Sequence, residues 1–179
     1  MMPIEIIKKY YKEGSDLYNI LLTHSFSVAN KALSILQNHP EFNLDKSFVY
    51  EASLLHDIGI FLTEAKEINC FGDYPYICHG YLGSNLLKKE GFPRHALVCE
   101  RHTGTGLSKD EIIINNLPLP HRDMLPISLE EQLICFSDKF YSKTKLEKEK
   151  SIDKIRKNLA IYGNSAVACF DKWCEMFLG

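Results

Sequence analysis

The chain has 179 residues, of which 45% are hydrophobic and 25% are charged, and its formal net charge is -2 at pH 7. This is the composition of an ordinary globular domain that is long enough to bury one hydrophobic core. The slightly negative charge excludes the strongly basic character of proteins that bind long nucleic acids, but it allows small nucleotides as ligands.

The first strong helical pattern spans residues 15–37. Ser15 is a suitable N-cap, and the apolar residues that follow it recur at helical spacing. His24 lies on this apolar face, between Leu21 and Val28. The pattern therefore predicts a long helix that presents a histidine to the protein interior.

A second apolar run ends in the string EASLLHDIG. Asp45 or Ser47 begins the predicted helix, and Gly59 ends it. His56 and Asp57 consequently lie together at the carboxyl end of a buried helix. A buried carboxylate without a partner costs on the order of several kcal/mol or becomes protonated, so Asp57 needs a partner.

The rest of the chain also has the pattern of helices joined by loops. The chain shows no convincing strand pair, and the proline-rich segment 117–126 is expected to be an ordered loop. The charged string KTKLEKEK is expected to be a solvated helix end or linker. Further helices are expected over residues 79–90, 93–102, 109–115, 152–162 and 165–177.

A capping box predicts the helix that carries the next candidate residue. Ser128 and Glu131 have the required spacing, and the helix is expected to continue to about Ser142. Asp138 lies within its apolar string EEQLICFSDKFY. With the residues already named, three separate helices then supply two histidines and two aspartates, which can satisfy one another around a divalent cation.

The cysteines and the N-terminal residues indicate the compartment. No two of the six cysteines have C-x-x-C spacing, and several lie in apolar stretches, which favours buried, reduced thiols over disulfides. The first residues, MMPIEIIKKYYKEG, do not resemble a signal peptide, and no stretch approaches the about 20 apolar residues of a membrane span. We expect a soluble, cytoplasmic protein.

The order of the candidate residues resembles the HD phosphohydrolase superfamily. His24, the adjacent pair His56-Asp57 in HDIG and Asp138 in SDK match its H…HD…D signature over about residues 20–142. The resemblance implies that these four residues coordinate a metal within an all-α bundle of about five core helices. One domain of residues 1–179 is expected, with a core of about 15–142 and a helical C-terminal extension of 151–179.

Two more histidines extend the resemblance to the two-metal branches of the superfamily. With His79 in CHG and His102 in HTG, the order H, HD, H, H, D is similar to bacterial diadenosine tetraphosphate hydrolases and to cyclic-dinucleotide phosphodiesterases. The resemblance implies that His79 and His102 hold a second ion and that Asp57 bridges the two. The cyclic-dinucleotide enzymes have two adjacent histidines and a G-Y-P string, whereas this chain has Arg101-His102, and DYP at 73–75. The diadenosine tetraphosphate branch is therefore the closer match.

These features predict a metal-dependent phosphohydrolase. It would cleave a phosphoester or phosphoanhydride of a nucleotide with a metal-activated hydroxide, in which Asp57 has a catalytic role as the bridging ligand. Imidazole and carboxylate ligands accommodate iron, manganese, zinc, cobalt or nickel, and the resemblance favours iron.

Cationic side chains are expected to bind the phosphate oxygens, because two metal ions leave much of a polyphosphate's charge uncompensated. Lys139, which follows Asp138, is ranked first and is also a catalytic candidate, because its long side chain can reach back to the site. Arg122 is ranked second, since the loop 117–126 could cover the site, and Arg101 is ranked third.

Two alternative functions remain open at the level of sequence. One is a mononuclear nucleotidase that uses only His24, His56, Asp57 and Asp138, and the other is a non-catalytic, metal-containing ligand-sensing domain. A complete ligand set argues against the sensor, because a structural scaffold does not need an open metal site. The expected partner is a small phosphorylated substrate. Binding to long nucleic acids or to membranes is not expected, and the sequence leaves open whether the protein forms a homodimer.

Overall fold

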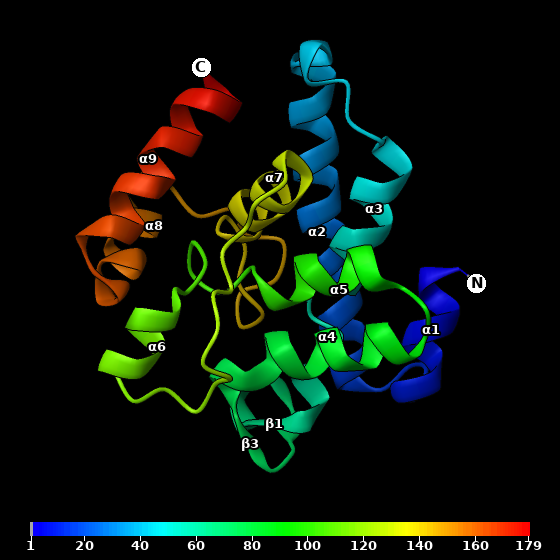
Figure 1. Cartoon of the computed structure of the whole chain (residues 1–179). Helices are drawn as coiled ribbons and strands as arrows, with labels where there is room; N and C mark the ends of the chain where they lie inside the picture. The colour runs from blue at the N-terminus through cyan, green and yellow to red at the C-terminus, as the bar shows by residue number, and fades with distance from the viewer. Residues whose placement is uncertain (1) are drawn as a thin grey trace.

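Helices dominate the computed structural model, which describes residues 2–179 (Figure 1). The helices are α1 (Pro3–Tyr10), α2 (Asp16–Asn38), α3 (Lys46–Leu55), α4 (His79–Lys89), α5 (Pro93–Glu100), α6 (Lys109–Ile114), α7 (Leu129–Asp138), α8 (Ile152–Leu159) and α9 (Asn164–Leu178). The expected all-α class is confirmed. Within the described residues, no helix combines the length and the apolar character that crossing a membrane requires.

Side-chain caps fix where three of the helices begin. Ser15 accepts a hydrogen bond from the backbone N–H of Tyr18, and Asp45 caps α3 in the same way. Ser128 caps α7 by accepting from the N–H of Glu131. The predicted starts of these helices are therefore confirmed to within a residue.

The predicted end of α7 is wrong, because the helix stops at Asp138 and not at Ser142. The N–H groups of Lys139, Phe140 and Tyr141 bond to carbonyls three residues back, so the last turn tightens and the chain leaves the helix axis. Glu131 also does not complete the capping box. Its carboxylate accepts from the N–H of Ile127 instead.

A small sheet before α4 contradicts the prediction that the chain has no strand pair. Strand β1 (Thr63–Ala65) lies between β2 (Cys70–Phe71), to which it is antiparallel, and β3 (Tyr74–Pro75), to which it is parallel. Strands of two or three residues are too short for alternation to be read from sequence. Helix α1 was not predicted either, although it buries Ile6 and Ile7 completely.

Five helices form the centre of the fold, namely α2, α3, α5 and α7, which pack on one another, and α4, which packs on α5. Helices α8 and α9 pack against each other, and α9 also packs against α7, at one edge of the molecule (Figure 1). The largest core lies between these two groups and includes the fully buried rings of Phe136, Phe170 and Phe177. All six cysteines are free thiols; four are buried, as expected, whereas Cys169 and Cys174 are half-buried.

Candidate metal centre

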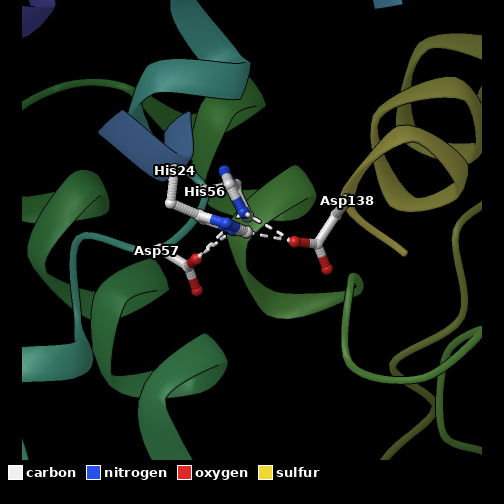
Figure 2. A group of neighbouring side chains, drawn as sticks. All are labelled: His24, His56, Asp57 and Asp138. Carbon is white, nitrogen blue, oxygen red and sulfur yellow. Dashed lines mark hydrogen bonds and ion pairs between the residues drawn. The ribbon is translucent and has the colours of Figure 1, made fainter. Parts of the chain in front are cut away.

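Four candidate ligands from three helices converge at the centre of the five-helix group (Figure 2). His24 comes from the middle of α2, His56 and Asp57 directly follow α3, and Asp138 is the last residue of α7. His24, His56 and Asp57 are at most 1% exposed, and the side chain of Asp138 is 12% exposed. Each residue thus reaches the cluster either from within a helix or from directly after one.

Each of the two histidines is within ion-pair distance of both aspartates. Nε2 of His24 lies 2.9 Å from Oδ1 of Asp138 and 3.1 Å from Oδ2 of Asp57. Nε2 of His56 lies 3.0 Å from Oδ2 of Asp57 and 3.4 Å from Oδ1 of Asp138 (Figure 2). One ligand atom from each of the four lies within 4.8 Å of all the others, a grouping that could hold a metal ion.

A second group shares Asp57 with the first. Oδ1 of Asp57 lies 3.3 Å from Nε2 of His79 and 3.3 Å from Nε2 of His102. Asp57, His79 and His102 again place one ligand atom each within 4.8 Å. Asp57 therefore turns one carboxylate oxygen toward each set of histidines.

Gly59 permits this close approach of α4 to the aspartate. A Cβ atom at Gly59 would lie 2.2 Å from the carbonyl oxygen of His79 and 2.5 Å from the backbone nitrogen of Gly83. Any side chain at this position would push α4, and His79 with it, away from Asp57. The glycine that ends the HDIG string thus has a structural reason to be there.

The histidine rings are oriented by backbone carbonyls. In three of them Nδ1 donates a hydrogen bond of 2.7 Å to the carbonyl oxygen three residues earlier, so that Nε2 points toward the cluster. The pairs are His56 with Ser53, His79 with Tyr76 and His102 with Cys99. Such a carbonyl partner is typical of metal-binding histidines, because it fixes the ring and its tautomer.

The resulting set of donor atoms fits a cation. With their Nδ1 atoms as donors, His79 and His102 point two Nε2 lone pairs at each other across 2.9 Å, an arrangement that a bound cation would relieve. Both carboxylate oxygens of Asp57 are buried and accept no well-directed hydrogen bond. Imidazole nitrogen and carboxylate oxygen together suit first-row divalent metals.

The aspartates remain ionised despite burial. Burial alone would raise the pKa of Asp57, but His56 and Lys143 hold it well below its usual value. Burial likewise opposes the charge on Asp138, and Lys139 with the histidines keeps the pKa of that carboxyl low. The cluster therefore offers two anionic ligands at neutral pH.

The histidines divide into two types. Burial lowers the pKa of His56, yet the adjacent Asp57 and Asp138 outweigh it and raise the value to about 10. Burial and the neighbouring His102 lower the pKa of His79 to about 3, and burial also lowers that of His102. His79 and His102 are therefore neutral at physiological pH, which is the form that binds metal.

Sequence reasoning missed Lys143, which reaches the buried aspartate from the string expected to be solvated. Its Nζ atom lies 2.6 Å from Oδ2 of Asp57, and its side chain is 12% exposed. Burial would lower the pKa of Lys143, but the charge of Asp57 raises it, so the residue is a fixed cation. Side chains in a loop follow no regular period, so the sequence does not show which way they point. The one feature of the sequence that could have indicated Lys143 is its closeness to Asp138 in the chain.

Of the three cations expected to bind phosphate, Lys139 lies at the site. Its Nζ atom donates to Oδ2 of Asp138 and to the carbonyl oxygen of His102, both at 2.8 Å. The long side chain bends back toward the ligand cluster from the end of α7. Lys139 also lines the cavity next to the cluster.

The structure does not bring Arg101 and Arg122, the other two expected phosphate ligands, to the lining of this cavity. Nη1 of Arg101 lies 2.8 Å from Glu131, and Arg122 forms an ion pair with Glu100. Both acids are less than 10% exposed, so each needs a cation and holds its arginine away from the cluster. The loop 117–126 does not line the cavity either.

The cavity beside the cluster has a volume of about 320 Å³. His79, His102 and Asp138 line its inner end, and Lys139, Lys143 and Lys150 add positive charge. Its outer wall comes from the C-terminal part of the chain, including Asn158, Leu159 and Tyr162. A ligand in this cavity would contact the candidate metal ligands, fixed cations and an aromatic ring together.

We expect Lys143→Met to lower the Tm of the metal-free protein by about 6–20 °C, because it removes a buried cation from Asp57 at a cost of roughly 3–5 kcal/mol. The loss should be smaller with metal bound, since the metal then supplies positive charge beside the aspartate. Thermal unfolding with and without a chelator measures both. Lys145→Met is the control, because Lys145 lies two residues further along the chain and is exposed, and it should change neither Tm. Equal losses in both forms would show that Lys143 contributes packing and not charge.

The sequence of this chain matches a protein family and two known proteins. The family model for the HD domain matches residues 21–142. The chain is 34% identical over 143 residues to the uncharacterized protein MJ0778 of Methanocaldococcus jannaschii, covering 78% of this chain and 77% of that protein. It is 29% identical over 125 residues to a tRNA (cytidine(56)-2'-O)-methyltransferase of Picrophilus torridus, covering 69% of this chain but only 32% of that protein. No solved structure matches significantly.

Proposed function

The chain belongs to the HD-domain family, and from this membership we propose that it is a metal-dependent phosphohydrolase that cleaves a phosphoester or phosphoanhydride of a small, nucleotide-type substrate. The observation that carries the proposal is Asp57, whose two buried oxygens face two separate sets of neutral or ion-paired histidines. The cavity beside this cluster gives a ligand access to it.

We propose that the site holds two divalent ions. His24, His56, Asp57 and Asp138 would hold one, and Asp57, His79 and His102 would hold the other. The mutual approach of two histidine lone pairs in the second group supports this number over a single ion. Iron is preferred by resemblance, and the donor types are equally suited to manganese, zinc, cobalt or nickel.

The chain's own residues would then position the substrate. Divalent ions at such a site supply Lewis acidity, which activates water as a nucleophile and neutralises charge on phosphoryl oxygens. Lys139 and Lys143 project from the cavity wall and can bind phosphoryl oxygens through charge-assisted hydrogen bonds. The carbonyl-held histidines and the buried aspartates would be preorganised, so the reaction would need little rearrangement of the protein.

The cavity supports a substrate of nucleotide size. Its volume of about 320 Å³ is at the lower end of small-molecule sites, which range from about 300 to 1,000 Å³. The rings of Tyr76, Tyr141 and Tyr162 line it and offer surfaces on which a base can stack. A dinucleoside polyphosphate is the leading candidate by resemblance, and this cavity would hold one end of such a molecule. Methyl transfer is not proposed, because the match covers only 32% of the methyltransferase.

Metal analysis of the purified protein, together with a panel of phosphorylated compounds, tests the proposal. We expect close to two divalent ions per chain and release of phosphate or nucleotide from nucleoside phosphates or dinucleoside polyphosphates. A chelator should abolish turnover, and added iron or manganese should restore it. Turnover of only non-phosphorylated compounds would contradict the proposal. A metal-loaded protein without any turnover would favour the ligand-sensing alternative.

A further inference from the structure

A second cavity, with a volume of about 480 Å³, adjoins the one beside the ligand cluster. Lys150 and Asn158 line both cavities, so they form the boundary between the two. The second cavity is formed by the segment between α7 and α8 and by α8 itself. We call it the lysine groove, after Lys145, Lys148, Lys150 and Lys154, which line it.

The positive charge of the lysine groove has no matching negative charge. Among residues 2–179, none of its four lysines forms an ion pair with a carboxylate. Glu149 is the acid in its lining, and that carboxylate is taken by Lys31 at 2.6 Å and by the hydroxyl of Tyr141 at 3.1 Å. A chain with a net charge of -2 therefore concentrates uncompensated cations in one groove.

Lys150 lies where the lysine groove meets the cavity beside the ligand cluster. Its Nζ atom donates to the carbonyl oxygens of Lys139 at 3.3 Å and Tyr141 at 3.0 Å, and a third N–H donor remains for a ligand. Burial and the nearby lysines lower the pKa of Lys150. A half-buried ammonium group with like-charged neighbours is stabilised when an anion binds between them.

We propose that the lysine groove is a second anion-binding subsite, which takes the phosphate groups of the substrate that lie beyond the one being cleaved. The inference rests on the proposed function and names its substrate class: a small molecule with a chain of phosphates that passes from the ligand cluster over Lys150 and Asn158 into the groove. The hydroxyl groups of Ser142, Thr144 and Ser151 also line the groove and can donate to phosphate oxygens.

The observations favour a small polyphosphate over a nucleic-acid strand. The free lysines are gathered in one groove of about 480 Å³, whereas a nucleic-acid strand is bound along an extended basic surface. The net charge of -2 also provides no such surface. Two adjacent cavities match a ligand with two parts, one at the cluster and one in the groove.

The test compares two triple variants that remove the same charge. Lys145→Gln, Lys148→Gln and Lys154→Gln together neutralise the groove. Lys12→Gln, Lys46→Gln and Lys89→Gln together form the control, since these lysines are exposed, form no ion pair among the described residues and line neither cavity. Titration calorimetry with inorganic tripolyphosphate should show binding at least about tenfold weaker in the groove variant than in the control, with a shallower salt dependence.

Kinetics provide the second readout. The ratio of kcat/KM for a dinucleoside tetraphosphate to that for a nucleoside monophosphate should fall at least about tenfold in the groove variant, with no change in the control. Equal affinity of the two variants for tripolyphosphate would overturn the subsite. Loss of affinity for a short oligoribonucleotide, with tripolyphosphate binding unchanged, would also overturn it in favour of nucleic acid. Weaker tripolyphosphate binding in a protein that hydrolyses no phosphate ester would support the subsite and refute the proposed function separately.

Discussion

Asp57→Asn is expected to remove bound metal and to reduce kcat/KM by about a thousandfold or more, which corresponds to roughly 4 kcal/mol of transition-state stabilisation. Both oxygens of Asp57 face histidines of the ligand cluster, so one substitution affects both candidate ion sites. The amide of asparagine has nearly the same shape but no negative charge. Metal analysis and a steady-state assay on the same preparation measure the two effects.

The same substitution should destabilise the metal-free protein, because it leaves Lys143 buried beside a neutral amide. Circular dichroism and a thermal scan therefore have to accompany the assay, to show that the variant is folded at the assay temperature. Asp45→Asn is the matched control, since it makes the same change at the other end of α3, where asparagine caps a helix as well as aspartate does. Wild-type metal content and rate in a folded Asp57→Asn variant would contradict the assignment of the whole cluster.

His79→Gln and His102→Gln are each expected to halve the metal content and to reduce the rate about a hundredfold or more. Both histidines direct their Nε2 atoms at the same oxygen of Asp57, whereas the other group uses His24, His56 and Asp138. Loss of one second-group ligand should therefore release one ion and leave the other in place. Glutamine can retain a hydrogen bond to the backbone, but it binds divalent metal poorly.

His95→Gln is the control for this pair. His95 lies on α5, close to His102 in the chain, but Nε2 of His95 lies 3.4 Å from Glu51 and the residue belongs to neither group. The His95→Gln substitution should leave the metal content and the rate unchanged. If His79→Gln and His102→Gln also leave the metal content unchanged, the mononuclear nucleotidase becomes the better interpretation.

Apart from Ser142, the lysine groove lies outside the part of the chain that the family model matches. The HD model covers residues 21–142, which contain every candidate metal ligand. The groove and the outer wall of the cavity beside the ligand cluster come from residues 142–162. We therefore expect relatives that share the ligand cluster to differ in substrate where this C-terminal segment differs.

The sequence by itself indicated where the three helices that position the candidate ligands begin and which residues are those candidates. Ser15, Asp45 and Ser128 mark the starts of helices because a cap is a local interaction between residues two or three positions apart. His24 and Asp138 could be selected because helical periodicity shows that a polar side chain faces an apolar interior. The order of the histidines and aspartates then indicated the family.

Only the tertiary structure decided which cations face the site. Lys143 meets Asp57 across 86 positions of the chain, and Arg101 and Arg122 turn to Glu131 and Glu100 instead, although the sequence places Arg101 next to a ligand. A loop residue has no period from which its direction can be read, and the direction of a long charged side chain depends on which buried acid lies within its reach. The small sheet around β1 and the two cavities also depend on packing between distant segments, which no local pattern encodes.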